Sequence, residues 1–209
     1  FDKMKHLTII RHAKSSWENP DLDDMVRPLN ERGKQAVVII GDYLKNKKIK
    51  PDLIITSPAT RALQTAIGIG TVLKYKTEDL KIEKAVYFGN TTSVIRIIEN
   101  TDNRFNDVFL FSHEPVLSSV IAALNGDVPD KFSTGAVCRM HFDITNWRDI
   151  TLKKGECEFF VNPKEAADWY QYWRKKRYAW WQSIGISSEN LRLREQTLDE
   201  LAHYAKEGA

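Results

Sequence analysis

Hydrophobic positions follow two different periods along the first 160 residues of the chain. Short runs of consecutive apolar and β-branched residues, such as 7–10, 52–56 and 107–111, are typical of strands that are buried on both faces. Segments with apolar residues every three or four positions lie between them, as in Val37, Ile40 and Leu44, and these are typical of helices with one buried side. The alternation predicts an α/β protein, a three-layer α/β/α sandwich with a mostly parallel central sheet.

The same pattern gives approximate bounds for each element. Strands are expected at about 7–10, 52–56, 81–87, 107–111, 136–142 and 156–161, and helices at about 31–48, 58–75, 92–100 and 115–124. Asn30 is expected to cap the first helix. Ser57 is expected to cap the second, with Pro58 at its first position.

The character of the chain changes after Pro163. Residues 164–181 are basic and aromatic and contain Trp169, Trp173, Trp180 and Trp181, whereas a second helical segment at about 188–206 is acidic. We therefore expect two domains, a catalytic domain over residues 1–162 and a C-terminal helical extension over residues 163–209.

The extension admits three interpretations. The aromatic face of a helix over 164–181 would most simply pack on the catalytic domain or on a second copy of the chain, giving a homo-oligomer. Its tryptophans and basic residues would also suit a membrane surface, although the acidic segment behind it argues against this. Single-stranded nucleic acid is the weakest alternative, and no nucleic-acid partner is expected.

Composition narrows the class of protein. The chain has 209 residues, 42% of them hydrophobic and 28% charged, with a net charge of +3, which is typical of a globular protein and excludes disordered and collagen-like classes. No apolar run has the length of about 18 residues that a membrane span needs. The start of the chain lacks the features of a secretory signal, and Cys138 and Cys157 are too few for a disulfide framework. These features predict a cytoplasmic protein with reduced thiols.

Charged and titratable residues gather where predicted strands end. Arg11 and His12 follow the strand at 7–10, and His113 follows the strand at 107–111. Arg61 lies in the first turn of the helix after the strand at 52–56, and Arg27 ends a polar loop. Because ligands of open α/β sheets bind at the carboxyl ends of the strands, and because guanidinium groups bind phosphate, this pattern predicts a phosphate site.

These residues lie within a series of motifs that resembles a known family. Arg11-His12-Ala13, Arg27-Pro28-Leu29, Ser57-Pro58-Ala59-Thr60-Arg61-Ala62, Ser112-His113 and Thr134-Gly135 occur in this order between about residues 5 and 162. Together they resemble the histidine phosphatase (phosphoglycerate mutase-like) superfamily and, more narrowly, the SixA-type phosphohistidine phosphatases. The part after Pro163 is not included in this resemblance.

The resemblance implies a role for each residue. His12 would be the nucleophile that accepts the phosphoryl group, and Arg11, Arg61 and His113 would bind the phosphoryl oxygens, with Arg27 as a further phosphate ligand. Neighbouring cations favour a neutral, nucleophilic imidazole, and they stabilise the charge of the phosphoryl oxygens during transfer. No metal and no other cofactor is expected, because the arginines supply the positive charge.

The ease with which the leaving group departs decides which class of substrate is expected. Branches of the superfamily that act on esters use a carboxylic acid near the third strand, and here that region reads Ala85-Val86-Tyr87-Phe88-Gly89-Asn90. An imidazole leaves more easily than an alkoxide, which favours phosphohistidine on a carrier protein as the substrate. Glu18, Asp23, Asp24 or Glu114 could still supply a proton, so a small phosphate ester is the alternative.

Glu114 raises a third alternative. Its negative charge follows His113 directly and would oppose a phosphate dianion, so that the domain would bind phosphate with weak catalysis or none.

Overall fold

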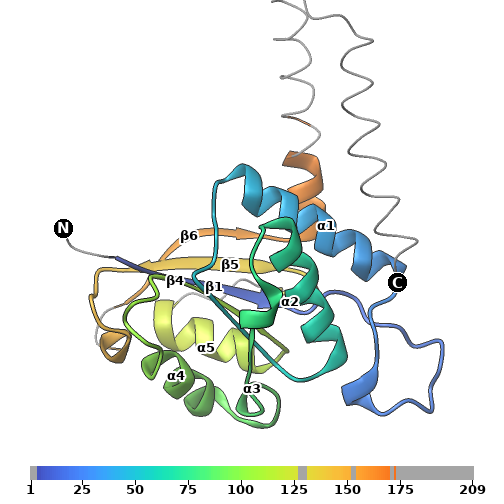
Figure 1. Ribbon diagram of the computed structural model, residues 1–209, viewed down its shortest axis with the longest axis horizontal. Helices are drawn as coiled ribbons and strands as arrows, with labels where there is room; N and C mark the ends of the chain where they lie inside the picture. Colours follow the sequence, from blue (N-terminus) through green and yellow to red (C-terminus); the bar gives the residue numbers. More distant parts are fainter. Residues whose placement is uncertain (1–3, 127–130, 152–153, 170–171, 173–209) are drawn as a thin grey trace, which may run out of the picture. The chain divides into compact units, whose positions relative to one another are not determined.

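The structure is a computed structural model, and it describes residues 4–126, 131–151, 154–169 and 172 (Figure 1). The chain divides into two units, residues 1–163 and 164–209. The predictions for the extension, including those for Trp173, Trp180 and Trp181, lie outside the described residues.

Six strands form the central sheet of the described part. They are β1 (Lys5–Arg11), β2 (Leu53–Thr56), β3 (Lys81–Ile82), β4 (Asp107–Ser112), β5 (Val137–Phe142) and β6 (Glu156–Val161), in the order β3-β2-β4-β1-β5-β6. The pairs β2–β3, β2–β4 and β1–β4 are parallel, whereas β5 is antiparallel to both of its neighbours. The sheet is therefore mostly parallel, as the sequence predicts.

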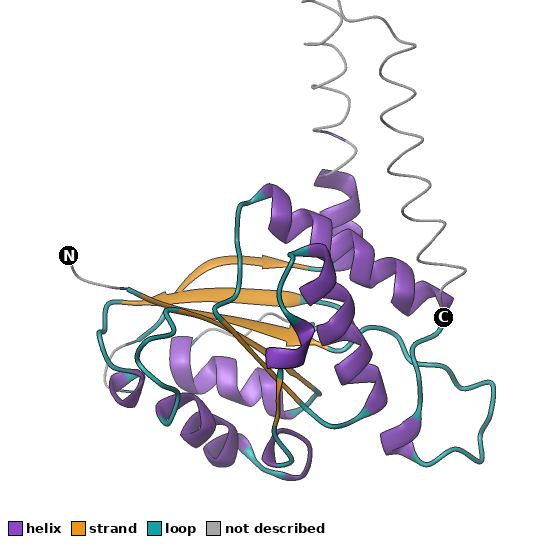
Figure 2. Ribbon diagram, viewed as in Figure 1, coloured by secondary structure: helices purple, strands orange, loops and turns teal. Residues whose placement is uncertain are grey.

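Helices cover both faces of this sheet (Figure 2). Helices α1 (Glu31–Asn46) and α2 (Thr60–Val72) pack against each other on one face. Helices α3 (Ala85–Phe88), α4 (Thr91–Glu99) and α5 (Val116–Asn125) lie on the other face. Short 3-10 turns occur at η1 (Asp24–Val26), η2 (Thr77–Asp79) and η3 (Trp147–Asp149). The three-layer α/β/α arrangement is confirmed.

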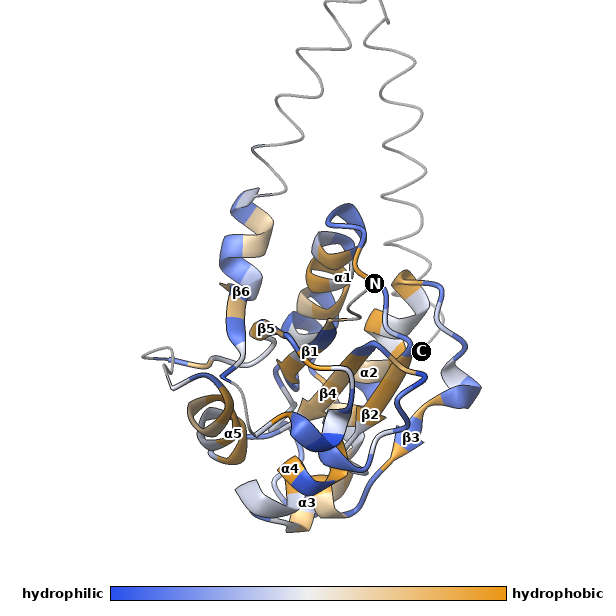
Figure 3. Ribbon diagram, turned by 90° about the vertical axis from the view of Figure 1, so that its left-hand side faces the viewer, coloured by the Kyte–Doolittle hydropathy of each residue, from blue (hydrophilic) through white to orange (hydrophobic). Residues whose placement is uncertain are grey.

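The strands are continuous apolar runs in the sequence because both faces of the sheet are buried. Strand residues Leu7, Ile9 and Leu110 belong to a core that also includes Leu117 and Ile121 of α5, and none of these side chains is exposed. Figure 3 shows hydrophobic residues along β2 and β4 and along helix α5. None of the described helices is both long enough and apolar enough to cross a bilayer.

Two predicted elements differ from the structure. Helix α2 begins at Thr60 and has Ala59 as its N-cap, so Ser57 does not cap it. The Ser57 hydroxyl instead accepts a hydrogen bond from the backbone N–H of Ala59 and contacts His113.

Strand β3 ends at Ile82 rather than continuing to Tyr87. It is an exposed edge strand with a single partner, and the chain beyond it turns into α3. That turn places Val86 in the core, where it is 1% exposed.

Candidate active site

The two site histidines follow neighbouring parallel strands. Arg11 of β1 is level with Ser112 of β4, so the next residues, His12 and His113, leave the sheet side by side. Their ring centroids are 4.9 Å apart. The sheet order therefore brings together two residues that are a hundred positions apart in the sequence.

His12 is held as a neutral imidazole with one nitrogen free of a proton. Nδ1 lies 2.8 Å from the carbonyl oxygen of Ala13, and because a carbonyl only accepts hydrogen bonds, Nδ1 carries the proton. Nε2 then presents its lone pair to the site, where Nε of Arg61 donates to it at 3.4 Å. Burial, aided by the charges of Arg61 and Arg11, lowers the pKa of His12 to about 4, against the partial opposition of the Ala13 hydrogen bond.

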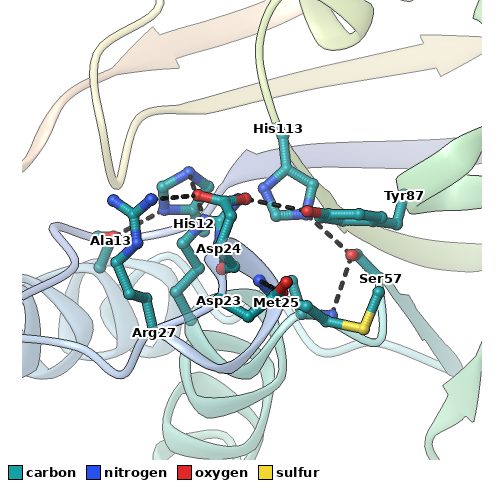
Figure 4. A network of polar contacts seen from close by, with 11 residues as sticks. His12, Ala13, Asp23, Asp24, Met25, Arg27, Ser57, Tyr87 and His113 are labelled. Atoms are coloured by element: carbon teal, nitrogen blue, oxygen red, sulfur yellow. Dashed lines mark hydrogen bonds and ion pairs between the residues drawn. The ribbon is translucent and has the colours of Figure 1, made fainter. Parts of the chain in front are cut away.

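His113 has a complementary arrangement. Its Nε2 lies 2.8 Å from the hydroxyl of Ser57, which also accepts a hydrogen bond from the backbone N–H of Ala59. Nδ1 of His113 is buried with no hydrogen-bond partner among the described residues. Figure 4 shows this nitrogen on the side of the ring that faces His12. Burial and the neighbouring His12 lower the pKa of His113 to about 3.

Three arginines converge on the two rings. Arg61 is the second residue of α2 and is 8% exposed. Arg11 donates through Nη1 to the carbonyl of Phe132 at 2.7 Å, and its Nε is buried without a partner in the described part of the chain. Arg27 lies with its guanidinium 3.5 Å from the ring centroid of Trp17.

A carboxylate that the sequence analysis names only as one of four possible proton donors joins these groups. Asp24 Oδ2 lies 2.7 Å from Nη2 of Arg61 and accepts a hydrogen bond from the Tyr87 hydroxyl at 2.9 Å. Asp24 Oδ1 lies 2.8 Å from Nη2 of Arg27. Burial raises the pKa of Asp24, but the Tyr87 hydrogen bond and the two arginines outweigh it, so the pKa lies below its usual value and the group is ionised.

The structure thus brings together His12, His113 and Arg61 directly, Arg11 through its charge on His12, and Arg27 through Asp24. Sequence reasoning missed the functional places of Ser57, Asp24 and Tyr87. A serine after a strand, such as Ser57, is equally typical of a helix N-cap, and Asp24 is one of several acidic residues in a polar loop. Only its position three residues before Arg27 in a short turn distinguishes it.

Two carboxylates close in sequence to the site residues are bound by other groups. Glu83 pairs with Lys81 at 2.8 Å. Glu114 accepts hydrogen bonds from the backbone N–H of Ser118 at 3.1 Å and from its hydroxyl at 2.5 Å, so its carboxylate caps the start of α5. From the segment after β3, the side chain that reaches the site is Tyr87, whose ring centroid is 5.3 Å from that of His113.

In the part of the chain that the structure describes, no group of three or more His, Cys, Asp or Glu side chains could hold a metal ion. Cys138 is buried and Cys157 exposed, and both are free thiols.

Comparison with known proteins gives two kinds of match. The sequence profile of the histidine phosphatase superfamily (branch 1) matches residues 7–85. Short segments also resemble glycine–tRNA ligases: 53% identity over 51 residues with the Thermus thermophilus protein and 42% over 59 residues with that of Rhodopirellula baltica. The chain spans 10% and 11% of the lengths of these two ligases.

Solved structures share the fold over most of the chain. A protein assigned as the phosphohistidine phosphatase SixA from Nakamurella multipartitia superposes with a TM-score of 0.67 at 18% identity, over 77% of this chain and 96% of the other. The protein histidine phosphatase SixA in complex with tungstate gives 0.65 at 23% identity, over 76% and 97%. At these identities the similarity shows the fold. The chain therefore has the fold of these SixA proteins, and its residues 7–85 match the sequence profile of the histidine phosphatase superfamily.

Proposed function

We propose that this protein removes the phosphoryl group from phosphohistidine on another protein, through a covalent intermediate on His12. The observation that carries the proposal is the state of His12, a buried neutral imidazole whose unprotonated Nε2 lies 3.4 Å from the guanidinium of Arg61. His12 and Arg61 are thus close enough for the imidazole to bind phosphorus while the guanidinium binds oxygen atoms of the same phosphoryl group.

The first step is an in-line displacement at phosphorus. Nε2 of His12 forms a bond to phosphorus while the bond between phosphorus and the substrate imidazole breaks. Arg61 and Arg11 stabilise the charge on the phosphoryl oxygens. With Ser57 donating to Nε2 of His113, the Nδ1 of this ring carries a proton that it can donate to one of these oxygens. In the second step, water attacks the phosphorus on His12, and inorganic phosphate and neutral His12 are released.

The leaving group favours phosphohistidine over an ester. An alkoxide must be protonated as it leaves, and Glu83 and Glu114 are held by Lys81 and Ser118 instead. Asp24 is ionised and therefore carries no proton to give. Phosphohistidine that is protonated on its other ring nitrogen releases a neutral imidazole, whose conjugate acid has a pKa of about 6.5, so it needs no acid from the enzyme.

The rim of the site supports a protein as the substrate. Trp17 is 67% and Phe88 is 69% exposed, and they contact Arg27 and Tyr87 respectively. Large exposed aromatic side chains beside a polar site are typical of protein interfaces. No nucleic-acid partner is proposed, and a cytoplasmic location, a homo-oligomer and membrane contact through residues 164–181 stay predictions from sequence.

The direct test is phosphate release from a phosphohistidine carrier protein. We expect turnover by the wild type and none by His12→Ala. Labelled phosphate should be trapped on His12 as an acid-labile adduct, which a pure phosphate-binding module would not form. Failure to form the adduct would reject the enzyme proposal.

A substrate panel separates phosphohistidine from the small-ester alternative. The panel compares the phosphorylated carrier with sugar phosphates at equal enzyme concentration. A higher kcat/KM for the carrier supports the leaving-group argument, whereas a clear preference for the esters would overturn it.

A further inference from the structure

The carboxylate of Asp24 occupies donors that a phosphoryl group on His12 would need. Both terminal nitrogens of Arg61 bond to Asp24, Nη2 to Oδ2 at 2.7 Å and Nη1 to the backbone carbonyl. Arg27 gives its Nη2 to the other carboxylate oxygen at 2.8 Å. Nε of Arg61 donates to His12, so three of the five N–H groups of this guanidinium are already used in the free protein, two of them by Asp24.

Burial differs sharply between the two sides of this interaction. The side chains of Arg61 and Arg27 are 9% and 12% exposed, whereas that of Asp24 is 49% exposed. The turn η1 that carries Asp24 has no buried residue. Arg61 is therefore a fixed part of the pocket on α2, whereas the acid comes from a segment, shared with Arg27, that little packing holds in place.

Figure 4 shows where the carboxylate lies. It reaches into the space beside the rings of His12 and His113, between Arg27 and the hydroxyl of Tyr87. Its negative charge acts to raise the pKa of both histidines, against the larger effects that lower it. A carboxylate and a phosphoryl group present oxygens with similar spacing to a guanidinium fork, so each can replace the other.

We propose that Asp24 acts as an internal competitor for the phosphate site: it pairs with Arg27 and Arg61 in the free protein and is displaced when a phosphoryl dianion binds. A dianion with three oxygens gains more from two guanidiniums than a single carboxylate does, so it displaces Asp24. A monoanion, such as a carboxylate or a phosphodiester, does not. Asp24 thereby makes the site selective for terminal phosphoryl groups. This inference rests on the proposed function, because it takes the arginines as phosphoryl ligands.

Binding of inorganic phosphate tests the inference without turnover. By calorimetry, Asp24→Asn and Asp24→Ala should bind phosphate about tenfold more tightly than the wild type. The matched control is Asp23→Asn. It removes a neighbouring charge, and asparagine retains the hydrogen bond that Asp23 accepts from Met25. The control should bind phosphate as the wild type does.

Acetate separates competition from a general charge effect. In Asp24→Ala, acetate can take the place of the missing carboxylate, so it should weaken phosphate binding at concentrations that leave the wild type unaffected. Removal of a distant charge would create no such site. Equal sensitivity of the two proteins to acetate would therefore overturn the proposal.

The remaining outcomes are also decisive. Weaker phosphate binding by both Asp24 variants would show that Asp24 positions the arginines. Unchanged binding would show that Asp24 does not compete with phosphate. Either result overturns the inference and leaves the proposed function in place. Absence of phosphate binding by the wild type and by every variant would overturn the proposed function as well.

Discussion

At the scale of single residues, the site depends on the protonation state of two buried histidines. His12 and His113 have pKa values of about 4 and 3 in the folded protein, whereas an imidazole exposed in the unfolded chain has a pKa of about 6.5. Both are therefore neutral near pH 7, where one can act as a nucleophile and the other can donate a single proton from Nδ1.

These pKa values predict how stability changes with pH. Above about pH 6.5, both folded and unfolded chains hold His12 neutral; between there and pH 4, only the unfolded chain takes up the proton, so stability falls as the pH falls. His12 alone should account for about 2 kcal/mol between pH 7 and pH 4.5. Urea unfolding of the wild type and of His12→Asn measures this difference. Equal pH dependence of the two proteins would contradict the assigned state of His12.

Ser57 offers a second prediction at this scale. In Ser57→Ala, His113 loses the hydroxyl that fixes its tautomer, so Nδ1 no longer always carries the proton. Turnover should fall about fivefold, the effect of one neutral hydrogen bond of about 1 kcal/mol. Steady-state kinetics measures the loss, and Ser119→Ala on α5 is the control. If the melting temperature of Ser57→Ala fell enough to explain the lower turnover, the positioning role would be rejected.

At the scale of elements, the sequence predicts those parts of the fold that local chemistry decides. Asn30 caps α1 as expected, with its side chain accepting from the N–H of Gly33 at 2.9 Å. Ser57 was misassigned because its hydroxyl is also suited to capping, and only the arrival of His113 from β4 decides its partner. The short β3 and the place of Asp24 likewise depend on contacts between distant parts of the chain, which no local pattern contains.

The close approach of α1 to the loop after β1 gives a prediction for an element. A Cβ on Gly33 would lie 2.1 Å from the carbonyl oxygen of Lys14, which is two residues after His12. Gly33→Ala must therefore displace this loop, and it should destabilise the protein by about 1–3 kcal/mol and lower turnover. Chemical denaturation and phosphate release measure the two effects.

Gly70→Ala in α2 is the matched control. A Cβ there has Ile54 Cδ1 at 3.3 Å as its nearest neighbour, which is a flexible side-chain end. Alanine favours a helix interior by up to about 1 kcal/mol, so this variant should be neutral or stabilised. Equal losses in the two glycine variants would show that general crowding, rather than the displaced loop, is responsible.

At the scale of the whole molecule, the fold brings cations from three separate elements to one site. The cations come from β1, the loop before α1 and the start of α2. A chelator such as EDTA should therefore leave phosphate release unchanged, because the guanidinium groups already stabilise the transferred charge. Loss of activity on chelation, restored by zinc or magnesium, would contradict this mechanism.

The exposed side chains at the rim of the site predict which substrates contact the protein surface outside the pocket. Phe88 lies at the end of α3, 69% exposed, with its ring centroid 4.7 Å from that of Tyr87, and it contributes no group to the chemistry. If the substrate is a protein, Phe88→Ala should lower kcat/KM for the phosphorylated carrier severalfold, because one exposed aromatic contact of an interface is lost.

Phosphoramidate has no surface with which to contact the rim, so its turnover should stay the same in Phe88→Ala. Ile67→Ala removes another exposed apolar side chain, 40% exposed and on α2 well beyond Arg61, and it should change neither substrate. Competition kinetics with both substrates in one reaction measures the ratio directly. An equal decrease for carrier and phosphoramidate would mean that Phe88 acts through Tyr87 on the site itself, and no change for either would argue for a small-molecule substrate.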